Sequence, residues 1–256
     1  MALSAPVTAV LLAGGARDEV CATTPAAPNK AFVPIGGITL ARRTLAALRS
    51  TPEVGRVIAV APLVDAALRE LAGADEFRPG GATMSQSLRA GVARLAPGAL
   101  VLVAASDLPV LSAGAIEEFL GLATASGADI VYACVERGTH ERLFPEVPHT
   151  WARLRDGTFC GGGLVALRPR ALERLDRFLG RLGAARKNPL RLASIFGYDV
   201  LARYALGRLS IAQAEQRASA LLGVRAAAAI CSHPEIAVNV DRATDVALAE
   251  RLVAAR

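Results

Sequence analysis

Four continuously apolar runs of strand length constrain the fold more than any other feature of this 256-residue sequence. Segments with helical spacing separate the runs, which read VTAVLLA (7–13), RVIAVA (56–61), ALVLVAA (99–105) and DIVYACV (129–135). A strand that is apolar on both sides must be covered on both faces, which is typical of a mostly parallel sheet between two layers of helices. The pattern therefore predicts an α/β fold with a three-layer sheet.

The chain length fits one domain, residues 1–256, because no polar or Ser/Gly-rich linker divides it. From about residue 168 helical signals replace the alternation, so we expect a helical insertion at about 169–223. No apolar run approaches the about 20 residues needed to cross a bilayer, and the first run lacks the basic segment of a secretion signal. We therefore expect a cytoplasmic monomer or homodimer with no membrane partner.

The clearest helix of the C-terminal region reads SIAQAEQRASALLG. Ser210 and Gln213 form a capping box at its start, and Gly223 marks its end. An apolar run follows at 224–231, and residues 236–240 then predict a final strand before a last helix.

The formal net charge of +6 favours acidic partners, either nucleic acid or phosphorylated small molecules. Residues 168–191 are rich in arginine, which would suit a nucleic-acid backbone. Acidic residues interrupt this stretch, and no aromatic residues interleave the basic ones as in single-strand binders. A nucleic-acid partner is therefore disfavoured, and a basic binding module stays as the non-enzymatic alternative.

Cysteine and histidine form no recognisable site in the sequence. The four cysteines are scattered without a C-x-x-C pair, which argues against both a zinc site and a disulfide framework. The three histidines, His140, His149 and His233, fall in no catalytic arrangement. We therefore expect no covalent catalysis by a cysteine and no histidine base.

Paired glycines follow the first predicted strand. Ligands gather beyond the carboxyl ends of parallel strands, and glycine lets backbone N–H groups approach an anion closely. Gly14 and Gly15 are therefore phosphate-binding candidates, although a tight turn alone would also favour glycine. Their spacing matches neither G-x-G-x-x-G nor the P-loop, which disfavours dinucleotide binding and Walker-type ATP hydrolysis.

Lys30 closes the loop after these glycines, and the only other lysine of the chain is Lys187. An ammonium on a flexible stem can follow a phosphate, whereas the arginine fork prefers a fixed bidentate geometry. Lys30 is therefore a further phosphate-binding candidate, and the alternative is a chance lysine on a surface loop. Lys187 lies in the helical insertion, where it would contact an acceptor phosphate, cap a helix or cover a dimer face.

Two acidic residues follow predicted strands and are candidates for a divalent cation. Asp107 comes directly after the third apolar run, and Mg²⁺ is usually held by one or two carboxylates with phosphates and water. Asn239 and Asp241 precede the last helix, and either would supply a second ligand. The alternatives are a turn or capping role for Asp107 and an N-cap role for Asp241.

In combination, five segments resemble the MobA-like nucleotidyltransferase family, which includes molybdenum-cofactor guanylyl- and cytidylyltransferases and is related to the methylerythritol-phosphate cytidylyltransferases. The segments are LLAGG, NKAFVPIGGITLARRTLAAL, GGATMSQSLRAGVARL, VLVAASDLPVL and VNVDRATDVALAERL. The resemblance covers residues 7–107 well and 224–255 fairly. It implies a Rossmann-like sheet of the GT-A type and Mg²⁺-dependent transfer of a nucleoside monophosphate. The implied donor is CTP or GTP, the acceptor is a small phosphorylated molecule, and pyrophosphate is released.

The resemblance also implies roles for individual residues. Lys30 and Asp107 would be catalytic, and Asp107 with Asp241 would hold Mg²⁺. Gly162 and Lys187 are candidates for acceptor binding. The implied nucleotide-binding residues are Leu12, Ala13, Gly14, Gly15, Arg17, Lys30, Gly80, Gly81, Ser85 and Ser87. Family members usually carry an arginine where this chain has Glu19, so Arg17 is the candidate substitute.

A second enzymatic interpretation keeps the fold and makes the donor a nucleotide sugar. Glycosyltransferases of this architecture commonly present an Asp-x-Asp pair to the metal, and the segment SDL supplies only one acid. The sequence therefore favours nucleotidyl transfer.

Overall fold

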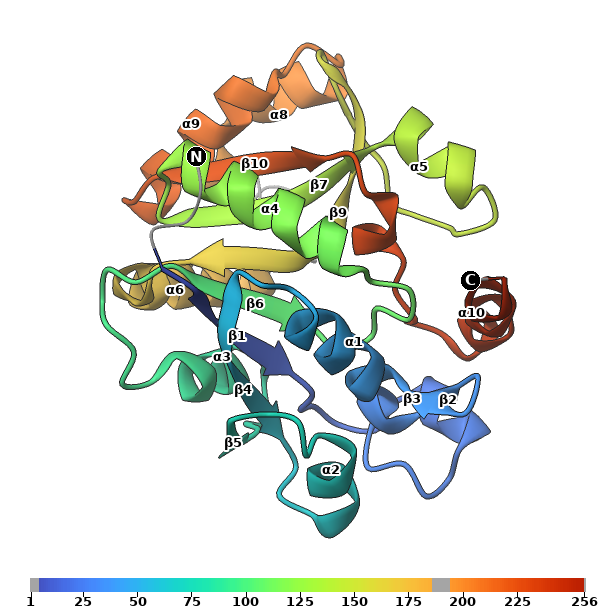
Figure 1. The fold of residues 1–256 in the computed structure, drawn as a ribbon. Coiled ribbons are helices and arrows are strands. Elements are labelled where there is room, and N and C mark those ends of the chain that lie inside the picture. The colour runs from blue at the N-terminus through green and yellow to red at the C-terminus, as the bar shows by residue number, and fades with distance from the viewer. Residues whose placement is uncertain (1–4, 186–193, 256) are drawn as a thin grey trace.

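The computed structural model describes residues 5–185 and 194–255, which form an eight-stranded sheet flanked by helices (Figure 1). The strands lie in the order β10-β7-β9-β6-β1-β4-β5, and β8 pairs with β9. Their bounds are β1 Val7–Leu12, β4 Val54–Ala61, β5 Glu76–Pro79, β6 Val101–Ala105, β7 Ile130–Glu136, β8 Ala152–Leu154, β9 Gly157–Leu167 and β10 Ala226–Cys231. A separate hairpin joins β2 (Pro34–Ile35) to β3 (Ile38–Thr39).

The pairing confirms the predicted mostly parallel sheet. Strand β1 runs parallel to both of its neighbours, so that Leu12 lies beside Val60 of β4 and Ala105 of β6. Strand β9 is the exception, because it lies antiparallel between β6 and β7. The chain builds outward from β1 through β4 and β5 and then crosses to β6, which makes the carboxyl ends of β1 and β6 the topological switch point of the sheet.

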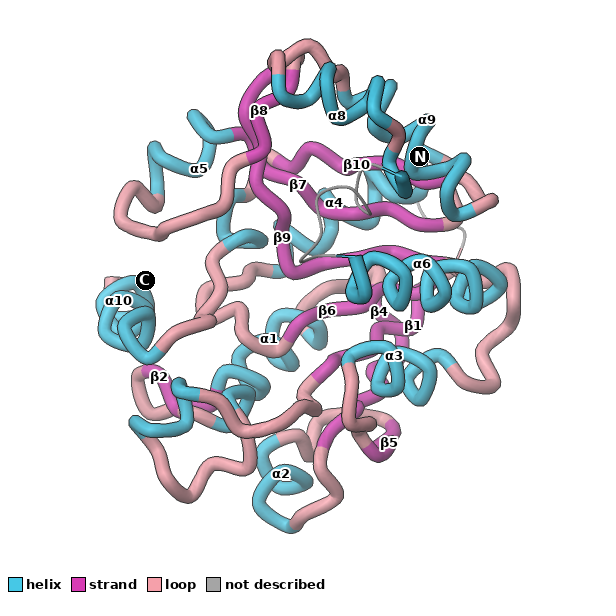
Figure 2. The backbone as a smooth tube through the Cα atoms, turned by 180° about the vertical axis from the view of Figure 1, so that it is seen from behind, coloured by secondary structure: helices cyan, strands magenta, loops and turns pink. Residues whose placement is uncertain are grey.

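Helices cover both faces of the sheet, which confirms the three layers. Helices α1 (Leu40–Arg49) and α4 (Ala113–Ser126) pack on one face, where Leu11 of β1 joins their apolar side chains. The opposite face, seen from behind in Figure 2, carries α3 (Met84–Val92) and α6 (Leu172–Ala185), and Val10 of β1 belongs to their core. Successive strand residues alternate between the two cores, so continuously apolar strands are required.

The described part of the region between β9 and β10 is helical, as expected. It contains α6, α8 (Tyr198–Ala205) and α9 (Ile211–Leu222). The prediction for α9 is confirmed in detail: Ser210 and Gln213 form the capping box, and Gly223 ends the helix in the left-handed conformation with φ +66°. Of the two lysines of the chain, Lys30 lies within the described residues and Lys187 lies outside them.

The predicted strand at residues 236–240 is wrong. Pro234–Ala237 instead form the 3₁₀ turn η4, and the backbone then extends toward the last helix. Strand β10 already closes this edge of the sheet, and η4 packs against β9 and β7. Residues 236–238 are buried by this packing, which accounts for their apolar character without strand pairing.

The last helix, α10 (Ala243–Ala254), packs away from the sheet (Figure 1). It contacts the 3₁₀ turn η1 (Glu19–Thr23) in the loop after β1 and the β2–β3 hairpin. Glu250 of α10 accepts a 2.7 Å hydrogen bond from the N–H of Gly36, which turns the hairpin with φ +59°. The remaining elements are α2 Asp65–Glu70, α5 Arg137–Leu143, η2 Lys30–Phe32 and η3 Pro169–Ala171. Every helix in the described ranges is too short or too polar to cross a lipid bilayer.

Candidate active site

Lys30 contacts both acidic candidates at the switch point of the sheet. Its Nζ lies 2.6 Å from Oδ2 of Asp107 and 2.8 Å from Oδ1 of Asp241. The two carboxylates are therefore neighbours, although 134 positions separate residues 107 and 241 in the sequence. The site combines one ammonium and two carboxylates from three distant parts of the chain.

Three different elements place these side chains. Lys30 is the first residue of η2, which Asn29 caps by accepting a hydrogen bond from the N–H of Ala31. Asp107 lies just beyond the carboxyl end of β6, and Asp241 lies just before α10. The N–H of Val240 donates to the backbone oxygen of Asp107 over 3.1 Å, so the backbone also holds the two acidic segments together.

The electrostatics of the site keep Lys30 charged. Burial by itself lowers the pKa of Lys30, but the charges and hydrogen bonds of Asp107 and Asp241 outweigh it and raise the pKa overall. The side chain of Asp107 is 12% exposed and that of Asp241 is 59% exposed. Lys30 is therefore a permanent cation between one shielded and one open carboxylate.

The glycine turn lies beside this cluster. Gly15 has φ +116°, a conformation that favours glycine, and no heavy atom lies near the place where a side chain would begin. A Cβ on Gly14 would lie 3.3 Å from the Cα of Gly80, so two backbones meet closely there. Among the described residues, no protein group accepts a hydrogen bond from the N–H of Gly14 or Gly15. These two donors are available to an anion.

Asn29 fastens the glycine turn to Lys30. Asn29 is 1% exposed, and its Nδ2 donates to the backbone oxygens of Ala13 at 3.0 Å and Gly15 at 3.4 Å. Its Oδ1 accepts from the N–H of Ala31. The side-chain amide therefore both donates and accepts hydrogen bonds in this loop. An ionised carboxylate of the same shape cannot do this, because it has no donor.

Asn29→Asp should lower the free energy of unfolding by about 2–4 kcal/mol, because a buried charge replaces the donor to two carbonyl oxygens. Urea unfolding at neutral pH measures this. Asp18→Asn is the matched control, since Asp18 caps η1 from an exposed position and asparagine caps equally well. Equal unfolding midpoints for the two variants would contradict the role of Asn29.

The other nucleotide-binding candidates occupy the same edge with different contacts. The hydroxyl of Ser87 is buried and accepts a 3.0 Å hydrogen bond from the N–H of Gly81, next to Gly80. Ser85 donates to Asp176 of α6, a residue that also pairs with Arg89. Its hydroxyl is therefore directed to a neighbouring helix.

Arg17 and the strand end complete the loop. The guanidinium of Arg17 donates to the backbone oxygen of Ala27, so it braces the loop internally. Leu12 ends β1, and the N–H of Ala13 donates to Val60 over 2.8 Å, which carries the sheet pairing up to the glycine turn.

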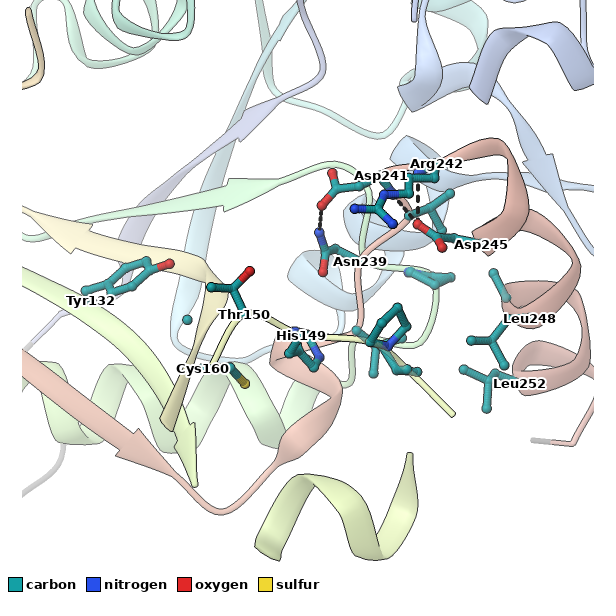
Figure 3. Close-up of a pocket in the computed structure, with 17 residues that line it drawn as sticks. Tyr132, His149, Thr150, Cys160, Asn239, Asp241, Arg242, Asp245, Leu248 and Leu252 are labelled. Atoms are coloured by element: carbon teal, nitrogen blue, oxygen red, sulfur yellow. Dashed lines mark hydrogen bonds between the residues drawn. The ribbon is translucent and has the colours of Figure 1, made fainter. Parts of the chain in front are cut away.

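A cavity of about 520 Å³ opens beside Asp241 (Figure 3). It lies between α10, the loop before β8, and strands β7 and β9. Gly161 lines it, whereas Gly162 does not, because the position of a side chain on Gly162 is filled by Ile236. The sequence pattern did not indicate this cavity, since its walls come from several separate segments. The lining residues are Pro109, Tyr132, Val147, Pro148, His149, Thr150, Cys160, Gly161, Val238, Asn239, Val240, Asp241, Arg242, Asp245, Leu248, Ala249 and Leu252.

Two histidines that form no recognisable site in the sequence are paired beside the cavity, and His149 lines its wall. Nε2 of His140 lies 2.9 Å from Nε2 of His149, and both rings lie edge-on to Trp151. Nδ1 of His140 is buried without a hydrogen-bond partner among the described residues. Burial, with the neighbouring His149, lowers the pKa of His140 to about 4. Burial also lowers the pKa of His149. The pair is therefore neutral at pH 7.

The lowered pKa of His140 predicts a loss of stability in acid. Because the unfolded chain binds the proton more tightly, this contribution is complete above pH 6.5 and is lost as the pH falls toward about 4. The loss should be on the order of 2–3 kcal/mol. Urea unfolding across this window should show a flatter acid limb for His140→Phe than for the wild type, since other groups contribute equally to both. Parallel curves would contradict the assignment.

The donor set at Asp107 and Asp241 fits Mg²⁺. Among the residues that the structure describes, no three His, Cys, Asp or Glu side chains form a metal-binding group. Mg²⁺ does not need one, because it commonly takes one or two carboxylates and completes its octahedron with phosphate oxygens and water. Two carboxylate oxygens that already converge on a single cation suit a metal that arrives with a nucleotide.

Comparisons with known proteins identify the family and the fold of this chain. The family described as the MobA-like NTP transferase domain matches residues 9–194. A hypothetical transferase from Thermus thermophilus has 32% identity and a TM-score of 0.82, covering 94% of this chain and 99% of its own. No curated protein sequence matches significantly.

Two more distant structures share the fold. A 4-diphosphocytidyl-2C-methyl-D-erythritol synthase has 15% identity and a TM-score of 0.60, covering 98% of this chain and 100% of its own. A CMP:2-keto-3-deoxy-manno-octonic acid synthetase complexed with CTP has 13% identity and a TM-score of 0.59, covering 98% and 99%.

Proposed function

The chain belongs to the MobA-like NTP transferase domain family and is a nucleotidyltransferase, and we propose that it transfers a nucleoside monophosphate from CTP or GTP to a small phosphorylated acceptor. The observation that carries the proposal is the convergence of Lys30, Asp107 and Asp241 at the switch point, next to the free N–H groups of the glycine turn. Ligands of open α/β sheets bind at this place.

The proposed reaction needs no nucleophilic side chain. An oxygen of the acceptor phosphate bonds to the α-phosphorus, and the bond from that phosphorus to the bridging oxygen breaks, so pyrophosphate leaves with the electron pair. Positioning and charge neutralisation carry such reactions. The N–H groups of Gly14 and Gly15 would bind phosphate oxygens, and Lys30 would offset negative charge on the leaving group.

Asp107 and Asp241 would hold Mg²⁺, which when bound neutralises phosphate charge and orients the triphosphate. Gly80, Gly81 and Ser87 would approach the base and ribose from the next loop along the sheet edge. Ser85 would contribute through its contact with α6, since its hydroxyl donates to Asp176.

A thermal-shift panel of nucleoside triphosphates, each with and without Mg²⁺, tests the donor. A triphosphate that binds the native state should stabilise it by about 2.7 kcal/mol at about 100 times its Kd. We expect CTP or GTP with Mg²⁺ to give the largest shift, and pyrophosphate release to require an acceptor. Stabilisation by sugar nucleotides alone, with release of nucleoside diphosphate, would support the glycosyltransferase alternative instead.

A further inference from the structure

Strand β9 carries consecutive glycines at 161–163, next to the two segments that hold the acidic residues of the site. These acid-bearing segments are residues 107–112 and 235–241. Strand β9 lies between β6 and β7 (Figure 2), and its register with β7 shifts between Gly161 and Val165. Because a bulge of this kind changes the direction in which residues point, two neighbouring glycines of β9 can face the acid-bearing segments together.

Gly163 receives the first acid-bearing segment. A Cβ on Gly163 would lie 2.8 Å from both Cδ atoms of Leu108 and 3.1 Å from its Cγ. Leu108 is fully buried and directly follows Asp107. The whole branched end of the leucine lies over the glycine, so a methyl group at position 163 must push Leu108 away from β9. Asp107 would move with it, because the packed interior leaves no other space.

Gly162 receives the second acid-bearing segment. A Cβ on Gly162 would overlap Cγ2 of Ile236 and would lie 3.1 Å from the backbone oxygen of the same residue. Ile236 is fully buried in the turn η4, which leads to Asp241. Since a backbone atom is among these contacts, a methyl group at position 162 must displace the turn itself and not only a side chain.

The two acid-bearing segments are also joined to each other at both ends. The hydroxyl of Ser112 donates to Oε1 of Glu235 over 2.7 Å, and Glu235 is 6% exposed. At the other end, the N–H of Val240 donates to the backbone oxygen of Asp107 over 3.1 Å. The segments therefore lie side by side in opposite directions, with a buried carboxylate holding one end and the acidic residues of the site at the other.

We propose that Gly162, Gly163 and Glu235 are positioning residues of the proposed metal site. This inference rests on the proposed function. The two glycines set how closely each acid-bearing segment approaches β9, and Glu235 sets the spacing between the segments. Together they fix the separation of the carboxylates of Asp107 and Asp241, and thereby the affinity of the site for Mg²⁺. Outer-shell partners of metal ligands commonly have effects of this kind.

Calorimetric titration of Mg²⁺ measures this positioning without turnover. The titration is made in Lys30→Met, where no ammonium competes for the two carboxylates, and in the same protein with one further substitution. Adding Gly162→Ala or Gly163→Ala should weaken Mg²⁺ binding about 10–100-fold, because the ligand-bearing segment is displaced.

Gly55→Ala in the same background is the matched control. A Cβ on Gly55 would lie 2.7 Å from the Cβ of Pro6, so this substitution crowds the fold in the same way. It does so at the amino end of β4, away from the carboxyl ends of the strands where the site lies. The control should lower the midpoint of urea unfolding and leave Mg²⁺ binding unchanged.

A pair of substitutions at position 235 tests the hydrogen bond between the segments. Glu235→Gln keeps an oxygen that can accept from Ser112, and we expect it to preserve the Mg²⁺ affinity. Glu235→Ala removes the acceptor and should weaken Mg²⁺ binding at least about tenfold. This pair decides the question if alanine at either glycine prevents folding.

The outcomes separate this inference from the proposed function. Unchanged Mg²⁺ affinity in the folded glycine variants, or an equal loss in Gly55→Ala, would overturn the positioning role. An equal loss in Glu235→Gln and Glu235→Ala would overturn the role of the hydrogen bond. Triphosphate-dependent pyrophosphate release would persist in these cases and leave the proposed function intact. Absence of Mg²⁺ binding in Lys30→Met itself would overturn both the positioning and the proposed metal site.

Discussion

Asp107→Asn should lower kcat/KM for triphosphate-dependent pyrophosphate release by about 10²–10³-fold, or about 3–4 kcal/mol of transition-state stabilisation. Asparagine keeps the shape of the side chain but removes the more shielded of the two carboxylates that meet at Lys30. We expect the Mg²⁺ concentration needed for half-maximal activity to rise as well, because one charged ligand of the proposed metal site is lost.

Asp129→Asn is the matched control for this prediction. Asp129 is also a shielded acid in an ion pair, since its side chain is 13% exposed and lies 2.7 Å from Arg170. It precedes β7 at the amino ends of the strands, away from the switch point. The control should lose some stability and keep its activity. Undiminished turnover in Asp107→Asn would contradict the assignment of Asp107 as a ligand of Mg²⁺.

Lys30→Met should lower kcat/KM by about 10²-fold, because a cation that neutralises the leaving phosphates is lost. The same substitution should strengthen Mg²⁺ binding while it weakens activity. Without the ammonium, Asp107 and Asp241 face each other with no counter-ion, so Mg²⁺ alone should bind more tightly than to the wild type. Calorimetric titration of Mg²⁺ in the absence of nucleotide measures this directly.

Lys30→Arg tests whether charge alone is sufficient. The planar guanidinium cannot occupy the space of a compact ammonium that contacts two carboxylates at 2.6 and 2.8 Å. We expect activity well below the wild type in spite of the retained charge. Wild-type rates in this variant would support the alternative that Lys30 is a chance lysine on a surface loop. Weaker Mg²⁺ binding in Lys30→Met would contradict competition between the ammonium and the metal.

Much of the sheet was predictable because its strands are buried on both faces. The apolar runs identify β1, β4, β6 and β7 directly, and the capping residues of α9 are local signals. Strand β9 escaped prediction because its glycines at 161–163 make room for Tyr132, Ile236 and Leu108, and a run of glycine does not resemble a strand. Residues 236–240 misled the prediction, since burial under β9 looks like burial within a sheet.

The site was predictable in part for the same reason. Positions just beyond buried strands meet at one edge of a parallel sheet, which brings Asp107 near the glycine turn. That Lys30 touches both acids depends on how α10 docks, and no local pattern encodes this. The pairing of His140 with His149 and the shape of the cavity likewise arise from loop packing between distant segments.

The placement of α10 also bears on the order in which the protein becomes competent during its synthesis. Lys30 and Asp107 come from the first half of the chain and can meet once β1 and β6 pair. Asp241 is synthesised after both of them, and it lies just before α10, which contacts the β2–β3 hairpin through Glu250. A nascent chain can thus pair most of its strands while its second acid is still missing, so the charged cluster is completed only after residue 241 has been synthesised.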